Sequence, residues 1–142
     1  YDYPGDEELA NELVNAGTAA GLPVIAVNDP THIWDYGTVV PLRYLVPNQD
    51  IPIINLSVCL AASLEETFQW GKQIGKVLRE SSKRVIFVGS GALSHNLVRG
   101  RENKPSRSEQ AMDNQFIAYL LNGEYKDARE MLNQYARIAG VE

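Results

Sequence analysis

The sequence has very few of the residues that build disulfide or metal frameworks. Its 142 residues include one cysteine, Cys59, and two histidines, His32 and His95. A single cysteine cannot form a disulfide within the chain, so we expect a reducing compartment, the cytoplasm. We expect Cys59 itself to be a small buried residue at a strand end. The two histidines are far apart and lack metal-ligand spacing, which excludes a self-contained zinc site.

Long apolar runs and an excess of basic residues are also absent. No stretch approaches the ~20 apolar residues that a helix needs to span a bilayer. The formal net charge is -5, whereas a nucleic-acid surface requires a clustered basic face. We therefore expect neither a membrane nor a nucleic acid as a partner.

The remaining pattern is that of an ordinary globular domain containing both helices and strands. With 44% hydrophobic residues, a chain of this length can bury about two-thirds of its unfolded surface as one domain. Apolar periodicity and turn-forming residues predict five helices and three strands. The helices are expected at 6–20, 38–45, 63–78, 108–121 and 124–139, and the strands at 22–27, 51–58 and 84–88.

The order of these elements predicts an α/β fold, with a mostly parallel sheet flanked by helices. The strand at 51–58 is continuously apolar, which favours a strand covered on both faces. The strand–helix–strand unit over 51–88 is expected to cross over right-handed between parallel strands. Three strands make a small sheet, so we expect residues 1–142 to be part of a single α/β domain that has lost strands at one or both ends.

Two helix starts carry capping signals. Ser63 and Glu66 fit a capping box, and the helix behind them carries Phe68 and Leu78 on one face. Thr38 is expected to cap the short helix, because Pro41 then falls in its first turn.

The first candidate functional segment is Gly-Ser-Gly-Ala-Leu-Ser-His at 89–95, after the strand at 84–88. Open α/β sheets bind ligands at the carboxyl ends of their strands, and histidine exchanges protons near neutral pH. The alternative is a structural histidine on a loop, whose ring has its hydrogen bonds satisfied. A dinucleotide-binding loop is disfavoured because Ser94 stands where the third glycine belongs. A hydrolase nucleophile elbow, Gly-x-Ser-x-Gly, needs one residue more on each side of the serine, so this run is too compact for it.

The second candidate segment is residues 35–44, where Tyr36 precedes a glycine at a helix entrance. Such a tyrosine can present its phenol to a crevice, and the alternative is a core tyrosine with a bonded hydroxyl. Arg43 and the arginines of the 99–107 loop offer cations for a substrate carboxylate. The alternative is that these arginines are ordinary residues of the solvated surface.

Together, residues 35–44 and 90–95 resemble two motifs of the class III extradiol ring-cleavage dioxygenases. Their order and separation match that family, with a strand and a crossover helix between them. The likeness covers the whole chain and is greatest to members that cleave homoprotocatechuate or aminophenols. It includes the late helical pair with its Leu-Leu-Asn-Gly-Glu-Tyr turn at 120–125.

The resemblance implies an Fe(II) enzyme that uses O₂ to open the ring of a catechol-type substrate. The family binds iron with two histidines and one glutamate, which leaves open positions for substrate and O₂. His95 matches the acid–base histidine of the family. Tyr36 matches a residue that orients the substrate or its oxygen adduct by hydrogen bonding. Glu142 matches the glutamate ligand. The two histidine ligands belong to a region expected before Tyr1, so the catalytic domain is expected to extend beyond both ends.

The family also contains non-catalytic subunits that keep the fold without the metal site. A structural or partner-binding module is therefore the alternative function, and a homo-oligomer or a two-subunit assembly is expected in either case. A generic nucleotide-binding domain is a more distant possibility.

Overall fold

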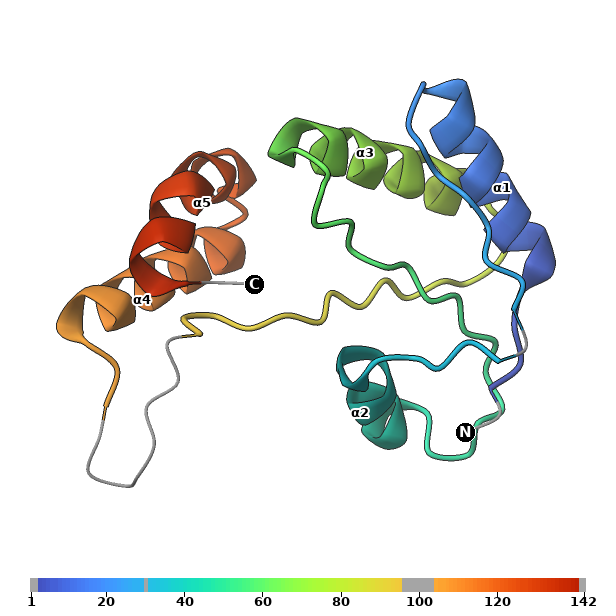
Figure 1. Cartoon of the computed structure of the whole chain (residues 1–142), viewed down its shortest axis with the longest axis horizontal. Helices are drawn as coiled ribbons and strands as arrows, with labels where there is room; N and C mark the ends of the chain where they lie inside the picture. The colour runs from blue at the N-terminus through green and yellow to red at the C-terminus, as the bar shows by residue number, and fades with distance from the viewer. Residues whose placement is uncertain (1–2, 30, 96–103, 141–142) are drawn as a thin grey trace. The chain divides into compact units, whose positions relative to one another are not determined.

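The computed structural model describes residues 3–29, 31–95 and 104–140, and within them the chain forms five helices (Figure 1). Their order is α1 (Glu7–Ala19), α2 (Tyr36–Leu45), α3 (Leu64–Glu80), α4 (Arg107–Asn122) and α5 (Tyr125–Ala139). The chain divides into two compact units between Gly89 and Ser90. That residues 1–142 belong to one domain therefore stays a prediction.

Side-chain caps determine where four of the helices begin. The side chain of Asp6 accepts from the Leu9 N–H at 3.0 Å and starts α1. Ser63 and Ser106 each form a complete capping box, at α3 and α4. Such caps satisfy backbone donors that have no partner within the helix. The capping box predicted at Ser63 and Glu66 is confirmed.

The prediction that Thr38 caps α2 is wrong. Asp35 is the cap, and its carboxylate accepts from the Thr38 N–H at 3.0 Å. Aspartate is at least as good a cap as threonine, and the helix therefore begins two residues before Thr38. Tyr36 thus becomes the first residue of α2, and Pro41 lies inside the helix instead of in its first turn.

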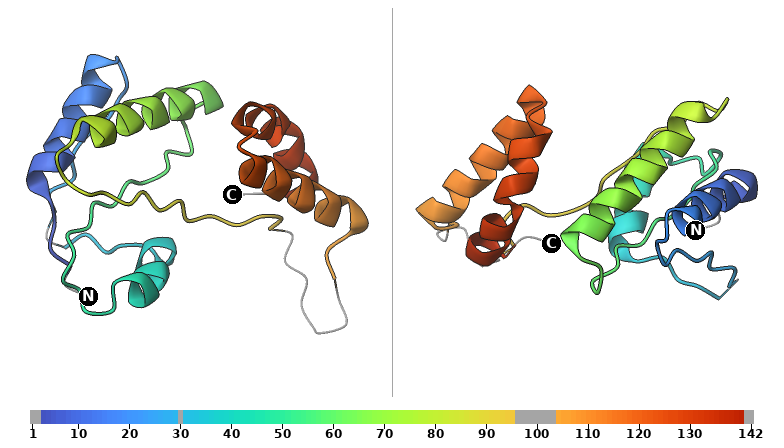
Figure 2. Two further views of the ribbon diagram at one scale, coloured as in Figure 1. Left: turned by 180° about the vertical axis from the view of Figure 1, so that it is seen from behind. Right: turned by 90° about the horizontal axis from the view of Figure 1, so that it is seen from above.

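In the first unit, α1 packs against α3, and the two helices lie side by side in both views of Figure 2. The buried residues of this contact are Leu9, Leu13 and Gly17 on α1 and Ile74 on α3. The face predicted for α3 is only partly covered, since Phe68 is 42% exposed.

The second helix is tied to the extended segments of the same unit. The Thr38 hydroxyl donates to the side-chain oxygen of Asn55 at 3.1 Å. Leu42 and Val46 are buried. The Ile53 N–H donates to the carbonyl of Pro4 at 2.8 Å, which joins the 51–58 segment to the start of the chain.

The predicted parallel sheet is wrong, because the described residues contain helices and no strand. The segments 22–27, 51–58 and 84–88 are present but exchange no backbone hydrogen bonds with one another in the described parts of the chain. Several of their apolar side chains are exposed, for example Ile25 at 79% and Ile86 at 88%. Cys59, expected to be buried at a strand end, is also exposed. Strand pairing depends on non-local partners, which local apolar runs do not specify.

The second unit contains an antiparallel hairpin of α4 and α5, joined at Gly123 (Figure 1). Gly123 ends α4 in the left-handed region at φ 74°, a conformation that glycine adopts without penalty. The ring of Tyr135 on α5 is 1% exposed and packs on Phe116 of α4 at a centroid distance of 5.3 Å. None of the described helices is long and apolar enough to cross a bilayer.

The carboxylate of Asp113 joins three parts of this second unit. It accepts hydrogen bonds from the Tyr135 hydroxyl on α5 and from both the N–H and the hydroxyl of Ser94. Burial alone raises the pKa of the Asp113 carboxyl, but the bonds from Ser94 and Tyr135 outweigh it and leave the pKa below its ordinary value. The charged form therefore stabilises the folded unit.

A first prediction concerns the contact between α1 and α3. An ideal Cβ on Gly17 would lie 2.6 Å from Val24 Cγ2 and 2.8 Å from Trp70 Cζ3. We expect Gly17→Ala to lower the free energy of unfolding by about 1–2 kcal/mol, because the overlap outweighs the gain in helix propensity. The matched control is Gly71→Ala on α3, where a Cβ meets nothing within 4 Å. Gly71→Ala should raise the free energy of unfolding by about 0.5–1 kcal/mol. Urea denaturation measures the free energy of unfolding of both variants. Equal changes in the two variants would contradict the close packing around Gly17.

A second prediction concerns the pH dependence of stability. The folded pKa of Asp113 lies below the unfolded value, so its contribution is complete above about pH 4 and disappears as the pH falls through the folded pKa. We expect the difference in urea midpoint between wild type and Asp113→Asn to narrow between about pH 6 and about pH 3. A difference that stays constant over this range would show that the charge of Asp113 contributes nothing.

Candidate functional site

The main chain of His95 is attached to the end of α5. Its N–H donates to the carbonyl of Ala139 at 2.9 Å, and Ala139 is fully buried. His95 itself is half-buried. The histidine that the sequence singles out is thus placed at a fixed point on the hairpin of α4 and α5.

The residue before it, Ser94, is attached to α4. Its N–H donates to Asp113 Oδ1 at 2.9 Å and its hydroxyl to Oδ2 of the same carboxylate at 2.6 Å. Burial raises the pKa of the Tyr135 phenol well above its usual range, and the bond to Asp113 and the charge of that carboxylate raise it further. The phenol therefore remains a hydrogen-bond donor to Asp113. Two consecutive residues, Ser94 and His95, are thereby fixed to two different helices.

Asp113 is the residue of this group that sequence patterns did not identify. It lies on a helix that was predicted correctly, but nothing in the local pattern distinguishes it from an aspartate on a solvated face. Its partners lie 19 and 22 residues away in the chain. Only the folded hairpin brings them together.

Tyr36, the other predicted site residue, is the first residue of α2 and is 78% exposed. The interpretation of Tyr36 as a core tyrosine is therefore wrong in this structure. Its helix start is fixed by the Asp35 cap, and α2 is joined to the 51–58 segment through Thr38 and Asn55. The backbone of Tyr36 is thus fixed at the start of α2, and its phenol is exposed.

Tyr36 lies in the first unit and His95 in the second. The predicted iron ligand Glu142 and most of the 99–107 loop lie outside the described residues. Arg43 is exposed on α2.

The described residues do not supply the donor set of an iron site. Within residues 3–29, 31–95 and 104–140, no three side chains of histidine, cysteine, aspartate or glutamate lie close enough together to hold a metal ion. Three protein ligands on one face of the metal are what the facial triad requires. The described part of the chain therefore does not contain a complete metal centre.

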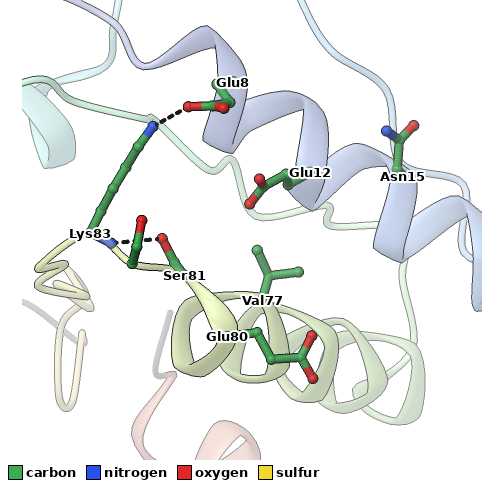
Figure 3. A pocket seen from close by; sticks show the side chains of 8 residues that line it. Glu8, Glu12, Asn15, Val77, Glu80, Ser81 and Lys83 are labelled. Carbon is green, nitrogen blue, oxygen red and sulfur yellow. Dashed lines mark hydrogen bonds and ion pairs between the residues drawn. The ribbon is translucent and has the colours of Figure 1, made fainter.

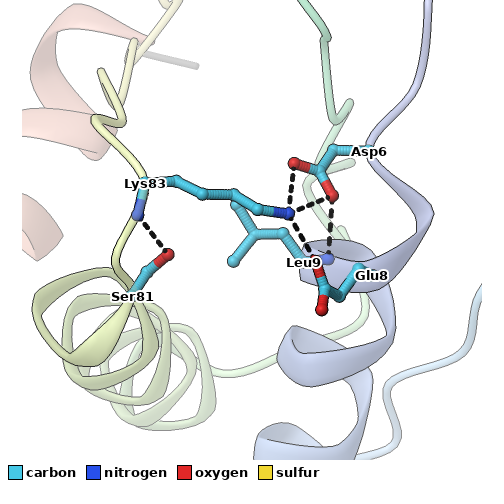
Figure 4. A network of polar contacts seen from close by, with 5 residues as sticks. All are labelled: Asp6, Glu8, Leu9, Ser81 and Lys83. Atoms are coloured by element: carbon cyan, nitrogen blue, oxygen red, sulfur yellow. Dashed lines mark hydrogen bonds and ion pairs between the residues drawn. The ribbon is translucent and has the colours of Figure 1, made fainter.

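A second polar cluster, outside the predicted site, lies between α1 and the end of α3 (Figure 3). A groove of about 530 Å³ is lined there by acidic side chains of both helices, among them Glu12 and Glu80. Lys83 also lines this groove and pairs with Glu8 at 2.8 Å and Asp6 at 2.9 Å (Figure 4).

This second cluster has a structural role. The bonds to Glu8 and Asp6 raise the pKa of Lys83 far above its usual value, and the bond to Lys83 in turn lowers the pKa of Asp6. A permanently charged ammonium group cannot act as a nucleophile or a base near neutral pH. Because Asp6 also caps α1, Lys83 links the start of α1 to the segment after α3.

Comparison with known proteins supports the family resemblance. Residues 1–142 match the family described as the catalytic LigB subunit of aromatic ring-opening dioxygenase. A 3,4-dihydroxyphenylacetate 2,3-dioxygenase of Escherichia coli is 25% identical over 143 residues, covering 96% of this chain and 52% of the relative.

Two subunits of a single type of enzyme are also similar. The beta subunit of a 2-aminophenol 1,6-dioxygenase from Pseudomonas is 24% identical over 158 residues, covering all of this chain and 52% of that subunit. The alpha subunit is 24% identical over 148 residues, covering all of this chain and 55% of that subunit. The chain thus spans about half the length of these curated relatives.

The family prediction made from residues 35–44 and 90–95 is confirmed by a match that runs along the whole chain. The chain belongs to the LigB family of aromatic ring-opening dioxygenases.

Proposed function

We propose that this chain is the part of an extradiol dioxygenase that handles protons and orients the substrate. The observation that carries the proposal is the family match over residues 1–142. The substrate class that we propose is a catechol or an aminophenol. It is supported by the names of the relatives, a dihydroxyphenylacetate dioxygenase and two aminophenol dioxygenase subunits.

We assign the acid–base role to His95. A neutral imidazole nitrogen can accept the proton of a substrate hydroxyl, and the resulting imidazolium can return it to a later intermediate. This role needs a ring at a defined position with some access to substrate. The half-buried His95, with its main chain bonded to Ala139, is suited to it.

We assign an orienting role to Tyr36. Its exposed phenol can donate a hydrogen bond to a substrate oxygen, and the capped start of α2 fixes the backbone of Tyr36. Such a bond adds selectivity for ring substituents with lone pairs.

We further propose ferrous iron as the metal, with Glu142 as one of its ligands. Both assignments rest on the family resemblance and on the match to a catalytic subunit family. A cytoplasmic location is proposed from the single, exposed Cys59, which would be exposed to oxidation elsewhere.

We propose that this chain functions within an assembly of two or more subunits. The similarity to both an alpha and a beta subunit supports a homo-oligomer or a two-subunit complex. The alternative function is a non-catalytic subunit of such an assembly. Iron content and oxygen uptake of the complete gene product, with catechols and aminophenols, separate the two. Stable assembly without iron or oxygen uptake would establish the alternative.

The acid–base assignment is tested by His95→Ala. We expect turnover to fall by about 10²- to 10⁴-fold while iron content stays unchanged, because the variant removes the proton carrier and no metal ligand. The control is His32→Ala, which removes the other histidine and should leave turnover unaltered. Oxygen uptake and metal analysis measure both. Full turnover in His95→Ala would refute the assignment.

The orienting role is tested by Tyr36→Phe. Losing one hydrogen bond to the substrate should lower kcat/KM by about 2- to 10-fold. Tyr44→Phe is the matched control, since Tyr44 lies on the same helix and is 82% exposed. Steady-state kinetics should give a lower kcat/KM for Tyr36→Phe than for Tyr44→Phe. Equal kcat/KM values would show that Tyr36 does not orient the substrate.

A further inference from the structure

We propose that Asp113 is a positioning residue that holds His95 in place for proton transfer, acting through Ser94. The proposal rests on the proposed function of His95. Asp113 lies on α4, which no motif connects with the candidate site, and its carboxylate is directed at the residue next to His95.

Ser94 bonds both oxygens of this one carboxylate. Its N–H donates to Oδ1 at 2.9 Å and its hydroxyl donates to Oδ2 at 2.6 Å. Hydrogen bonds to a charged acceptor are roughly twice as strong as neutral ones. Ser94 therefore cannot shift or rotate without losing two charge-assisted bonds.

The carboxylate of Asp113 is itself held in place. Its Oδ1 also accepts from the Tyr135 hydroxyl, and Tyr135 is 1% exposed and packed on Phe116. Tyr135 comes from α5 and Asp113 from α4, so the hairpin braces the carboxylate from both helices. The carboxylate that binds Ser94 is therefore held in place by the packing of α4 against α5.

The restraint on Ser94 also limits the position of His95, because the two residues are adjacent in the main chain. The chain passes directly from Ser94 to His95, whose N–H bonds the carbonyl of Ala139 at the end of α5. The peptide between the two residues is planar and stiff. With Ser94 fixed to α4 and His95 fixed to α5, the Cα of His95 has little freedom. A displacement of ~1 Å at a reacting group can reduce a rate by about 10²-fold.

The competing explanation is that Asp113 only stabilises the hairpin. A control for that explanation exists on the same helix. Ser106 caps α4 through a capping box with Glu109, and its hydroxyl also lies 3.0 Å from that of Ser108, so its bonds serve the start of α4. Ser106→Ala should therefore weaken α4 while leaving the bonds from Ser94 to Asp113 intact.

The experiment compares Ser94→Ala, Asp113→Asn and Ser106→Ala in the complete gene product. We expect Ser94→Ala and Asp113→Asn to lower kcat by about 10- to 100-fold with little change in KM, because substrate binding is kept and proton transfer is misaligned. Ser106→Ala should lower the melting temperature and leave kcat unchanged. The double variant Ser94→Ala/Asp113→Asn should be no slower than the worse single variant, because both single variants remove the bond from the Ser94 hydroxyl to the carboxylate of Asp113.

A second measurement does not depend on catalysis. Hydrogen exchange of the His95 amide, followed by NMR, reports whether the bond to Ala139 persists. Exchange should accelerate about tenfold or more in Ser94→Ala and Asp113→Asn, and stay near the wild-type rate in Ser106→Ala.

The outcomes separate the two proposals. If the wild type consumes no oxygen with any catechol or aminophenol, the proposed function fails, and the exchange measurement alone decides whether Asp113 positions His95. If kcat falls equally in all three variants in step with stability, Asp113 is a structural residue and the positioning proposal is overturned. An unchanged kcat or an unchanged exchange rate in Ser94→Ala also overturns it.

Discussion

The second unit of this protein depends on one half-buried carboxylate that accepts three hydrogen bonds. Asp113 receives bonds from α5 and from the segment before α4, so a single charge fixes both the hairpin and the residue beside His95. Removing a donor from such a group leaves part of its desolvation uncompensated. The same interaction thus connects the stability of the fold with the geometry of the proposed acid–base residue.

The helices were largely predictable from the sequence because their determinants are local. The apolar spacing of α1, the capping box at Ser63 and the glycine at position 123 act within a few residues, and the structure places the helices close to the predicted ranges. The error at α2 has the same local character. Asp35 and Thr38 are both residue types that cap helices, and the structure has Asp35 in the extended conformation of a cap, at φ -67° and ψ 165°.

The sheet and the connections within the site were not predictable in this way. The 84–88 run is apolar and extended, but apolar character does not provide a partner strand. On α3, Ile74 is buried whereas Phe68 is 42% exposed, and the local sequence pattern does not specify which of the two α1 covers. His95 could be singled out because glycines and a family motif surround it. Asp113 could not, because its partners are distant in sequence and its own neighbourhood is ordinary.

The short sequence separations in the second unit have a consequence for how it forms. The bonds from Ser94 and Tyr135 to Asp113 span only 19 and 22 residues, and α4 starts at its own capping box. Closing such small loops costs little chain entropy, and contact order of this kind is typical of fast-folding helical proteins. The bonds to Asp113 therefore close loops of moderate length, whereas the bond from His95 to Ala139 joins residues near the two ends of the unit and completes the surroundings of His95.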